Sequence, residues 1–174
     1  MGNLEQELTK LRGFEEVQEE HKAHHTVYTD EKKKKVIFPK EVKLPKRADE
    51  KSAGYDFYMP CDLTLSPMQK TIVFTDVKAY MQEDELLQIY IRSSLAIKQG
   101  LMLSNNVGII DSSYYNNKGN DGNIGIALVN TTGKTIQLKE GDRIAQGVFI
   151  KFLTIDMEEL LDTKRTGGMG SSGK

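Results

Sequence analysis

Residues 85–100 read ELLQIYIRSSLAIKQG, and the first half of this stretch contains the pattern that decides the fold. Leu87, Ile89 and Ile91 are apolar and recur at every second position. A period of two is typical of a β-strand that buries one of its two faces. We therefore expect a strand here, with these three side chains directed toward the core.

The second half of the same stretch changes to a helical pattern. Ser93 or Ser94 can cap the start of a helix, because a serine hydroxyl accepts a hydrogen bond from a free backbone N–H. Residues 95–99 suit a helix, and Gly100 can end it. The prediction is one short helix that interrupts a series of strands.

Short runs with a period of two recur on both sides of this stretch, bounded by Gly, Asp, Asn, Ser or Pro. The apolar residues of these runs are Leu63 and Leu65, Ile72 and Phe74, Ile124, Ile126 and Leu128, Ile136 and Leu138, and Val148, Ile150 and Phe152. Such spacing favours an all-β sandwich or barrel-like roll. The sequence contains no βαβ unit and no glycine-rich nucleotide fingerprint.

The composition limits the classes of function. The chain has 174 residues, 24 Lys and Arg against 25 Asp and Glu, and 38% hydrophobic residues, which suits one domain of ordinary size. Its net charge of −1 lacks the basic excess of proteins that bind nucleic acid directly through bulk electrostatics. No apolar run reaches 18 residues and the N-terminus is charged, so we expect no membrane span and no signal peptide. The single Cys61 cannot form an internal disulfide, which favours the cytoplasm.

Changes in composition and hydrophobic pattern along the sequence divide the chain into three parts. Residues 1–35 are expected to be an N-terminal extension or insertion, with a short helix or strand and then a charged loop over 18–35. Residues 36–162 form the β-roll, and residues 163–174 form a glycine-rich arm that we expect to be mobile. The three histidines near the start of the loop suit an exposed polar stretch better than a metal site.

Two segments have the chemistry to bind a phosphate. Arg92, Ser93 and Ser94 place a guanidinium and two hydroxyls at the start of the predicted helix, although an ordinary capped helix with a surface arginine has the same pattern. The glycines and serines of 163–174 can offer backbone N–H groups to an anion, although a flexible terminus has the same composition.

Two further residues are polar in otherwise apolar surroundings. Asp111 ends the apolar run 107–110, and a carboxylate at such a turn can orient and deprotonate a water, although an aspartate there is more often a turn-former. Gln146 lies between Ile144 and Val148 in the period-two pattern, so we expect it to face the core. A polar group in that position needs a partner, which a ligand can supply.

Five segments, taken in order, resemble the sequence blocks of the trimeric dUTPase family, the dUTP diphosphatases of bacteria and phages among others. The segments are 53–56 (AGYD), 92–96 (RSSLA), 105–114 (NNVGIIDSSY), 141–146 (GDRIAQ) and 167–173 (GGMGSSG). The resemblance implies a jelly-roll-like subunit and a homotrimer with active sites at the subunit junctions. It also implies hydrolysis of dUTP to dUMP and pyrophosphate with magnesium on the triphosphate, a step of nucleotide metabolism that keeps uracil out of DNA.

The same resemblance implies roles for individual residues. Asp111 would activate the water that attacks the α-phosphorus, Gln146 would contact the phosphates, and Asp56 would reach magnesium through water. The residues implied to bind the nucleotide are Arg92, Ser93 and Ser94 at the phosphates, Asn105, Gly108 and Ile109 at the uracil, Tyr114 at the deoxyribose, and Lys164, Arg165, Met169, Gly170, Ser171 and Ser172 in a closing tail.

Several positions depart from the family pattern. Ser94 and Ser113 stand where a glycine and a second aspartate are usual, and Met169 stands where a phenylalanine is usual. The arginine of the last block is shifted by one position, so either Lys164 or Arg165 is a candidate for the γ-phosphate contact.

Two other functions stay open from the sequence. The related dCTP deaminases use a glutamate on the strand after the third block, where this chain has Ala127, and without that carboxylate deamination lacks its acid–base group. A phage regulatory protein on the same roll could instead bind a repressor, with or without catalysis. Its candidate surfaces are 18–35 and an insert at 115–121.

Overall fold

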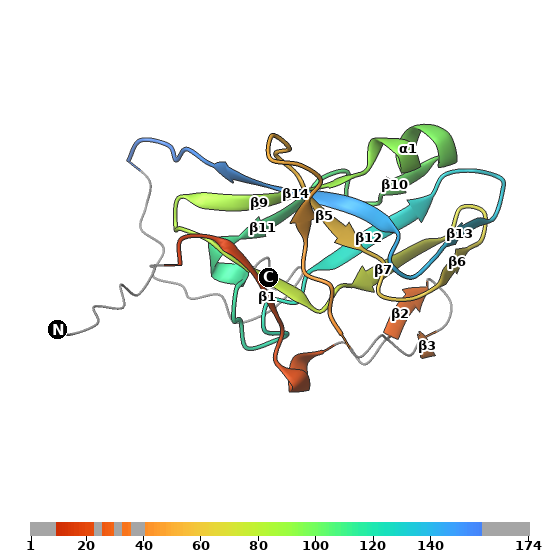
Figure 1. The fold of residues 1–174 in the computed structure, drawn as a ribbon, viewed down its shortest axis with the longest axis horizontal. Helices are drawn as coiled ribbons and strands as arrows, with labels where there is room; N and C mark the ends of the chain where they lie inside the picture. The colour runs from red at the N-terminus through yellow and green to blue at the C-terminus, as the bar shows by residue number, and fades with distance from the viewer. Residues whose placement is uncertain (1–9, 23–25, 30–32, 36–40, 158–174) are drawn as a thin grey trace.

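The computed structural model describes residues 10–22, 26–29, 33–35 and 41–157, and over these residues the chain is mostly β-structure (Figure 1). Two five-stranded antiparallel sheets form the body of the molecule, which confirms the predicted all-β, jelly-roll-like class. The first sheet has the order β11–β9–β14–β5–β4, with bounds Gly108–Asp111, Glu85–Ile91, Arg143–Lys151, Tyr55–Tyr58 and Lys46–Arg47.

The second sheet and the smaller elements complete the roll. The second sheet has the order β10–β12–β7–β2–β3, with bounds Leu101–Leu103, Gly125–Asn130, Lys70–Phe74, Thr26–Thr29 and Lys33–Lys35. Two further pairs are β1 (Gly13–Glu16) with β8 (Val77–Tyr80) and β13 (Ile136–Leu138) with β6 (Leu63–Leu65). The helical segments are α1 (Ser93–Gln99) and the 3-10 turns η1 (Glu19–His21) and η2 (Ser112–Tyr114).

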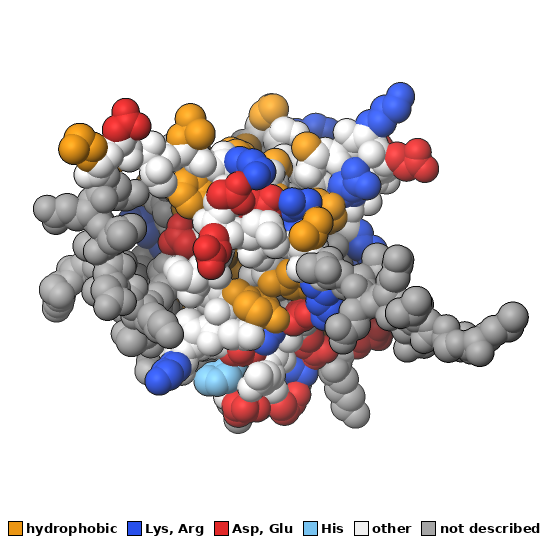
Figure 2. Space-filling model, turned by 90° about the vertical axis from the view of Figure 1, so that its left-hand side faces the viewer, with side chains coloured by type: hydrophobic (Ala, Val, Ile, Leu, Met, Phe, Trp, Pro, Cys, Tyr) orange, Lys and Arg blue, Asp and Glu red, His pale blue; other side chains and the backbone are white. Residues whose placement is uncertain are grey.

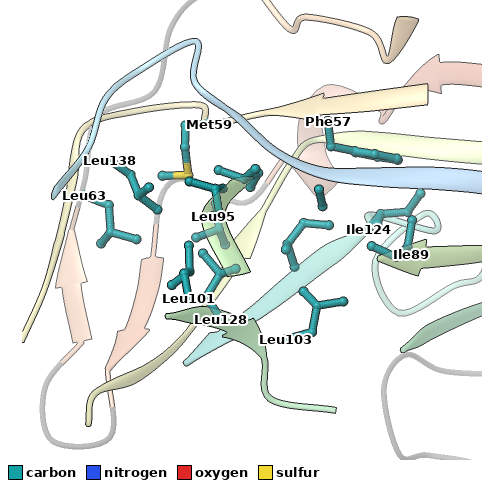
Figure 3. Packing of buried hydrophobic residues seen from close by; sticks show 14 of the residues in the cluster. Phe57, Met59, Leu63, Ile89, Leu95, Leu101, Leu103, Ile124, Leu128 and Leu138 are labelled. Atoms are coloured by element: carbon teal, nitrogen blue, oxygen red, sulfur yellow. The ribbon is translucent and has the colours of Figure 1, made fainter. Parts of the chain in front are cut away.

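Side chains from both large sheets meet in one hydrophobic core (Figure 3). Leu87 and Ile89 of β9 are buried there, as are Ile126 and Leu128 of β12. Their period-two spacing therefore predicts both the strands and the inward faces correctly.

Strand β7 forms as predicted, but its inward face is the opposite of the expected one. Thr71 and Val73 are buried, whereas Ile72 and Phe74 are only partly buried. The register with β12 accounts for this, because Thr71 and Val73 lie opposite the buried Leu128 and Ile126 and share their face. On the outer face, a Cβ at Gly125 would lie 3.0 Å from Ile72 and 3.2 Å from the ring of Phe74. Two large side chains on the outer face thus cover a position that has no side chain of its own.

Helix α1 forms where predicted and ends as predicted, but it begins one residue earlier than a Ser93 cap predicts and two earlier than a Ser94 cap predicts. Arg92 takes the N-cap position, so neither serine caps the helix. Gly100 adopts a left-handed φ of 66° and donates its N–H to the carbonyls of Leu95 and Ala96, which ends the helix. No helix in the described ranges is long and apolar enough to cross a membrane.

The start of the described chain is part of the roll. Strand β1 pairs with β8, so a strand forms within the predicted N-terminal extension. The ring of Phe14 packs against those of Tyr55, Phe57 and Phe149, with centroids 5.3 to 5.6 Å apart.

The expectation of a loop over 18–35 is wrong for two segments. Residues 26–29 and 33–35 form β2 and β3, and β2 pairs with β7. Without them β7 would present an unpaired edge, and an antiparallel hairpin satisfies those backbone groups despite its charged sequence. Of the three histidines, His21 ends η1, and the other two lie outside the described residues.

Candidate active site

A buried carboxylate connects two arginines at one end of the first sheet. Asp56 of β5 is 5% exposed. Its two oxygens contact Arg92 Nε at 3.3 Å and Arg143 Nη1 at 3.1 Å. A guanidinium has five N–H donors, so the carboxylate fixes both side chains and leaves donors for a further anion. We call Arg92 and Arg143 the arginine pair. Both side chains are partly exposed, so they can bind phosphate oxygens.

Gln146 lies beside the arginine pair, and the predicted direction of its side chain is wrong. A β-bulge between Arg143 and Ala145 shifts the register of β14, so that Ile144 and Ala145 are both fully buried. After the bulge the inward and outward positions are exchanged, and Gln146 is half-buried on the outer face, directly opposite Asp56. The same shift carries Val148, Ile150 and Phe152 out of the core.

The glycine of the AGYD segment makes room for Gln146. A Cβ at Gly54 would lie only 2.5 Å from Gln146 Oε1. The two segments that carry these residues are far apart in the sequence, and the pairing of β5 with β14 brings them together.

The start of α1 adjoins this cluster. Arg92 precedes the helix, and its backbone N–H donates to the carbonyl of Ile144 at 3.3 Å, which ties the helix to β14. Ser93 and Ser94 are exposed in the first turn. The structure therefore brings five predicted residues to one region, together with Arg143, which the sequence reasoning missed although it lies within the segment 141–146.

The turn that joins β10 to β11, which lie in different sheets, places the second group of predicted residues. Asn105 is exposed, and Asn106 turns the chain with a φ of 67°. A Cβ at Gly108 would lie 3.0 Å from Cβ of Ile89 on β9, so the close pairing of these strands favours glycine. Ile109 is 58% exposed on the outer face.

Asp111 and Tyr114 lie at the two ends of the 3-10 turn that follows β11. Asp111 is exposed at the end of β11 and takes the N-cap position of η2. Tyr114 is only 4% exposed, and its hydroxyl donates to the carbonyl of Asn123 at 3.0 Å. A contact with a sugar is therefore limited to the small part of Tyr114 that reaches the surface.

A single chain keeps the two groups apart. Asp111 lies opposite Leu86 of β9, whereas Asp56 lies opposite Gln146, which pairs with Tyr90 four residues further along β9. With a strand spacing of about 4.8 Å and a rise of about 3.4 Å per residue, the two carboxylates are on the order of 20 Å apart. One small nucleotide cannot bridge that span by short contacts within one chain.

Other predicted features lie elsewhere. Lys164, Arg165, Met169, Gly170, Ser171 and Ser172 lie outside the described residues. A groove of about 450 Å³ beside β5 and β8 contains none of the predicted site residues. Burial raises the pKa of Cys61 to about 11, so this thiol stays protonated at neutral pH and is a poor nucleophile.

Together these features define an all-β protein with a surface suited to an anion and a separate exposed carboxylate. Residues 40–173 match the family model of dUTPase. The deoxyuridine 5'-triphosphate nucleotidohydrolase of Lactococcus lactis is 42% identical over 133 residues, which cover 76% of this chain and 89% of that relative. The enzyme of the same name from Mus musculus is 37% identical over 134 residues, covering 75% of this chain and 78% of that relative.

Solved structures agree with these relatives. The crystal structure of dUTPase from Streptococcus mutans has a TM-score of 0.67 and 39% identity, and the match covers 83% of this chain and 98% of that one. The dUTPase of phage phi11 of S. aureus has a TM-score of 0.60, with 80% and 99% covered, but at 22% identity it shows the fold alone. The chain belongs to the dUTPase family and is an enzyme of that family.

Proposed function

We propose that the chain hydrolyses dUTP to dUMP and pyrophosphate. The observation that carries this proposal is the arginine pair around Asp56, with Gln146 opposite it, inside a domain of the dUTPase family. A triphosphate brings about four negative charges, and two guanidiniums are well suited to oppose them. The named activity of the Lactococcus lactis relative supports the same reaction.

Each group has a separate task in this proposal. Asp111 accepts a proton from the water that attacks the α-phosphorus, because it is an exposed carboxylate at a fixed turn. The β11 backbone at Gly108 and Ile109, with Asn105 in the turn before it, hydrogen-bonds the uracil edge, and Tyr114 limits the space at C2′ of the sugar. Arg92, with the two serines that follow it, and Gln146 hold the phosphates.

The remaining predicted residues belong to the tail. In the proposal, residues 163–174 close over the nucleotide, with Met169 and Gly170 beside the base and Ser171, Ser172 and either Lys164 or Arg165 on the γ-phosphate. Closure would exclude water and hold the triphosphate in line for attack. This assignment rests on the family resemblance of the segment.

The residues present suit magnesium that binds together with the triphosphate. Among the described residues no group of three or more His, Cys, Asp or Glu side chains could hold a metal ion. Asp56 is a single carboxylate already engaged by the arginine pair, so it would hold the ion through water. When bound, magnesium supplies positive charge that neutralises the phosphates.

We further propose that the enzyme is a homotrimer with each site shared between copies. The separation of Asp111 from Asp56 supports this, because a second copy can bring the two groups onto one nucleotide. The outer face of β11, β9 and β14 carries the apolar residues Ile109, Leu86, Val148 and Ile150, which suits contact with another copy. Figure 2 shows exposed hydrophobic side chains beside charges of both signs on one face of the molecule.

Pyrophosphate release tests the proposed reaction. The protein is assayed with dUTP, dCTP, dTTP and UTP, each with and without magnesium. We expect release from dUTP in magnesium and far less with the other nucleotides or after the metal is removed. No release from dUTP, or an equal rate with dCTP, would reject the proposal.

A further inference from the structure

We propose that Asn117 and Asn120, within the insert at 115–121, are positioning residues for Asp111. They hold Tyr114 at both its phenol and its carbonyl oxygen, and Tyr114 fixes the corner where Asp111 leaves β11. The inference rests on the proposed function, because it concerns the carboxylate proposed to activate water. It assigns the insert to the catalytic apparatus rather than to a partner-binding surface.

The phenol end of Tyr114 is held by two hydrogen bonds. Its hydroxyl accepts from Asn120 Nδ2 at 2.7 Å and donates to the carbonyl of Asn123 at 3.0 Å. The ring is 4% exposed, so these bonds are shielded from water. A buried hydroxyl with both a donor and an acceptor partner has one preferred orientation, which fixes the ring.

The backbone end of Tyr114 is held by the neighbouring amide. Asn117 Nδ2 donates to the carbonyl of Tyr114 at 2.8 Å and to Asn120 Oδ1 at 2.7 Å. Gly122 passes close to the same carbonyl with a φ of 85°, where a Cβ would lie 2.8 Å from the oxygen. The two asparagines therefore hold each other as well as Tyr114.

A buried ion pair fixes the insert to the rest of the molecule. Lys78 Nζ of β8 lies 2.8 Å from Asp121 Oδ2, and both side chains are 5% exposed. Lys78 also donates to Asn116 Oδ1 at 2.7 Å, and the carboxylate of Asp121 accepts the backbone N–H of Gln18 at 2.8 Å. A buried network whose hydrogen bonds are all satisfied is rigid, so it holds the insert and its asparagines in fixed positions.

Asp111 depends on this anchor because it ends a strand at the edge of its sheet. Within the described part of the chain β11 pairs only with β9. Asp111 is both the last residue of β11 and the N-cap of η2, and η2 ends at Tyr114. The position of the carboxylate is thus set from one side by β9 and from the other by Tyr114. A displacement of about 1 Å at a catalytic group can cost about 100-fold in rate.

The test compares Asn120→Ala, Tyr114→Phe and the double variant with Asn130→Ala as a matched control. Asn130 is buried more deeply than the half-buried Asn120 and also donates to backbone carbonyls, those of Leu65, Ser66 and Lys134, but it lies at the far end of β12 from Asn123. All proteins are assayed below their melting temperatures for kcat with dUTP, for affinity toward a non-hydrolysable dUTP analogue, and for hydrogen exchange across 108–115.

The proposal predicts how kcat, hydrogen exchange, analogue affinity and melting temperature change in each variant. Asn120→Ala lowers kcat about 10- to 100-fold and speeds exchange across 108–115, while analogue affinity changes less than about threefold. The double variant is no slower than the slower single variant, because both remove the same anchor. Asn130→Ala lowers the melting temperature but not kcat.

Two results would overturn the inference. One is an unchanged kcat in both Asn120→Ala and Tyr114→Phe. Tyr114→Phe is the conservative change, so its result alone decides the test if the alanine variant does not fold. The other is an equal loss of kcat in the Asn130→Ala control. If the unmodified protein fails to hydrolyse dUTP, the proposed function is wrong, and hydrogen exchange across 108–115 still decides whether the asparagines hold the corner.

Discussion

Asp111 and Asp56 lie on the same outer face of one sheet but at positions separated by three strand steps and four residues. The arrangement separates the proposed base from the proposed phosphate-binding group. In the proposed homotrimer, a nucleotide that contacts both carboxylates lies between two copies of the chain, so catalysis would depend on assembly.

Replacing the proposed base should greatly lower turnover without loss of binding. We expect Asp111→Asn to lower kcat for dUTP by about 10²- to 10⁴-fold, the usual contribution of one general base, because the amide cannot take a proton from water. Pyrophosphate release and analogue titration measure the two effects. Asp62→Asn, an exposed aspartate paired with Lys139, is the control. Undiminished turnover in Asp111→Asn would exclude this carboxylate as the base.

A methyl group at Gly54 should displace Gln146. The new Cβ would lie 2.5 Å from Oε1 of that side chain, so the amide must move from its place opposite Asp56. We expect Gly54→Ala to lower kcat/KM for dUTP by about tenfold while the protein stays folded. Gly133→Ala, where a Cβ meets nothing within 4 Å, should behave as the unmodified protein. Equal activity in the two variants would show that Gln146 has no role at the phosphates.

Breaking the buried ion pair of the insert should cost stability. Lys78→Met leaves the carboxylate of Asp121 buried without its cation, for which we expect a loss of about 3–5 kcal/mol in the free energy of unfolding. Lys139→Met breaks an exposed pair with Asp62 and should cost less than about 1 kcal/mol. Denaturant unfolding of the two variants gives the comparison. Similar losses would mean that the Lys78 pair is not shielded from water.

The unfolding free energy should fall in acid because of Glu85. The hydrogen bonds from Arg12 hold the pKa of this buried carboxyl below its usual value near 4.5. A lowered folded-state pKa stabilises the protein above the unfolded-state value, and that stability is lost as the pH falls through the folded-state value. Denaturant titrations from pH 6 to pH 3 should therefore show a smaller decline in Glu85→Gln. An identical decline would show that the pair of Arg12 and Glu85 does not contribute to the loss of unfolding free energy in acid.

Deleting the tail should separate assembly from turnover. We expect removal of residues 167–174 to leave the oligomer intact and to lower kcat steeply, because the proposed closure over the triphosphate is lost. Light scattering and pyrophosphate release measure the two properties on one sample. An unchanged kcat would contradict the closing role of the tail.

The sequence predicts the fold well where hydrophobic pattern and local turn chemistry agree. Leu87 and Ile89 indicate both the strand and its buried face, and Gly100 marks the end of α1. The pattern is misleading where neighbours decide the outcome. The bulge at Arg143 reverses the side of Gln146, and the register of β7 with β12 places Ile72 on the outer face.

The burial of residues in the insert at 115–121 could not be predicted from the sequence. Residues 115–121 are polar and by sequence a candidate partner-binding surface, yet Asn117 and Asp121 are buried. Their burial depends on Lys78, which is 43 residues away from Asp121 in the chain and carries no local signal of a partner. Similarly, the pairing of Arg143 with Asp56 depends on strand order, although both residues lie in recognised segments.

Mixing two inactive variants tests the shared site most directly. Asp111→Asn and Arg92→Ala are each assayed alone, then unfolded together in equal amounts, refolded and assayed for pyrophosphate release from dUTP. Sites between copies predict that random mixing restores about a quarter of the unmodified activity, because one junction in four combines an intact Asp111 with an intact Arg92 from a neighbour. A refolded mixture that contains mixed oligomers but stays as inactive as its components would contradict the account.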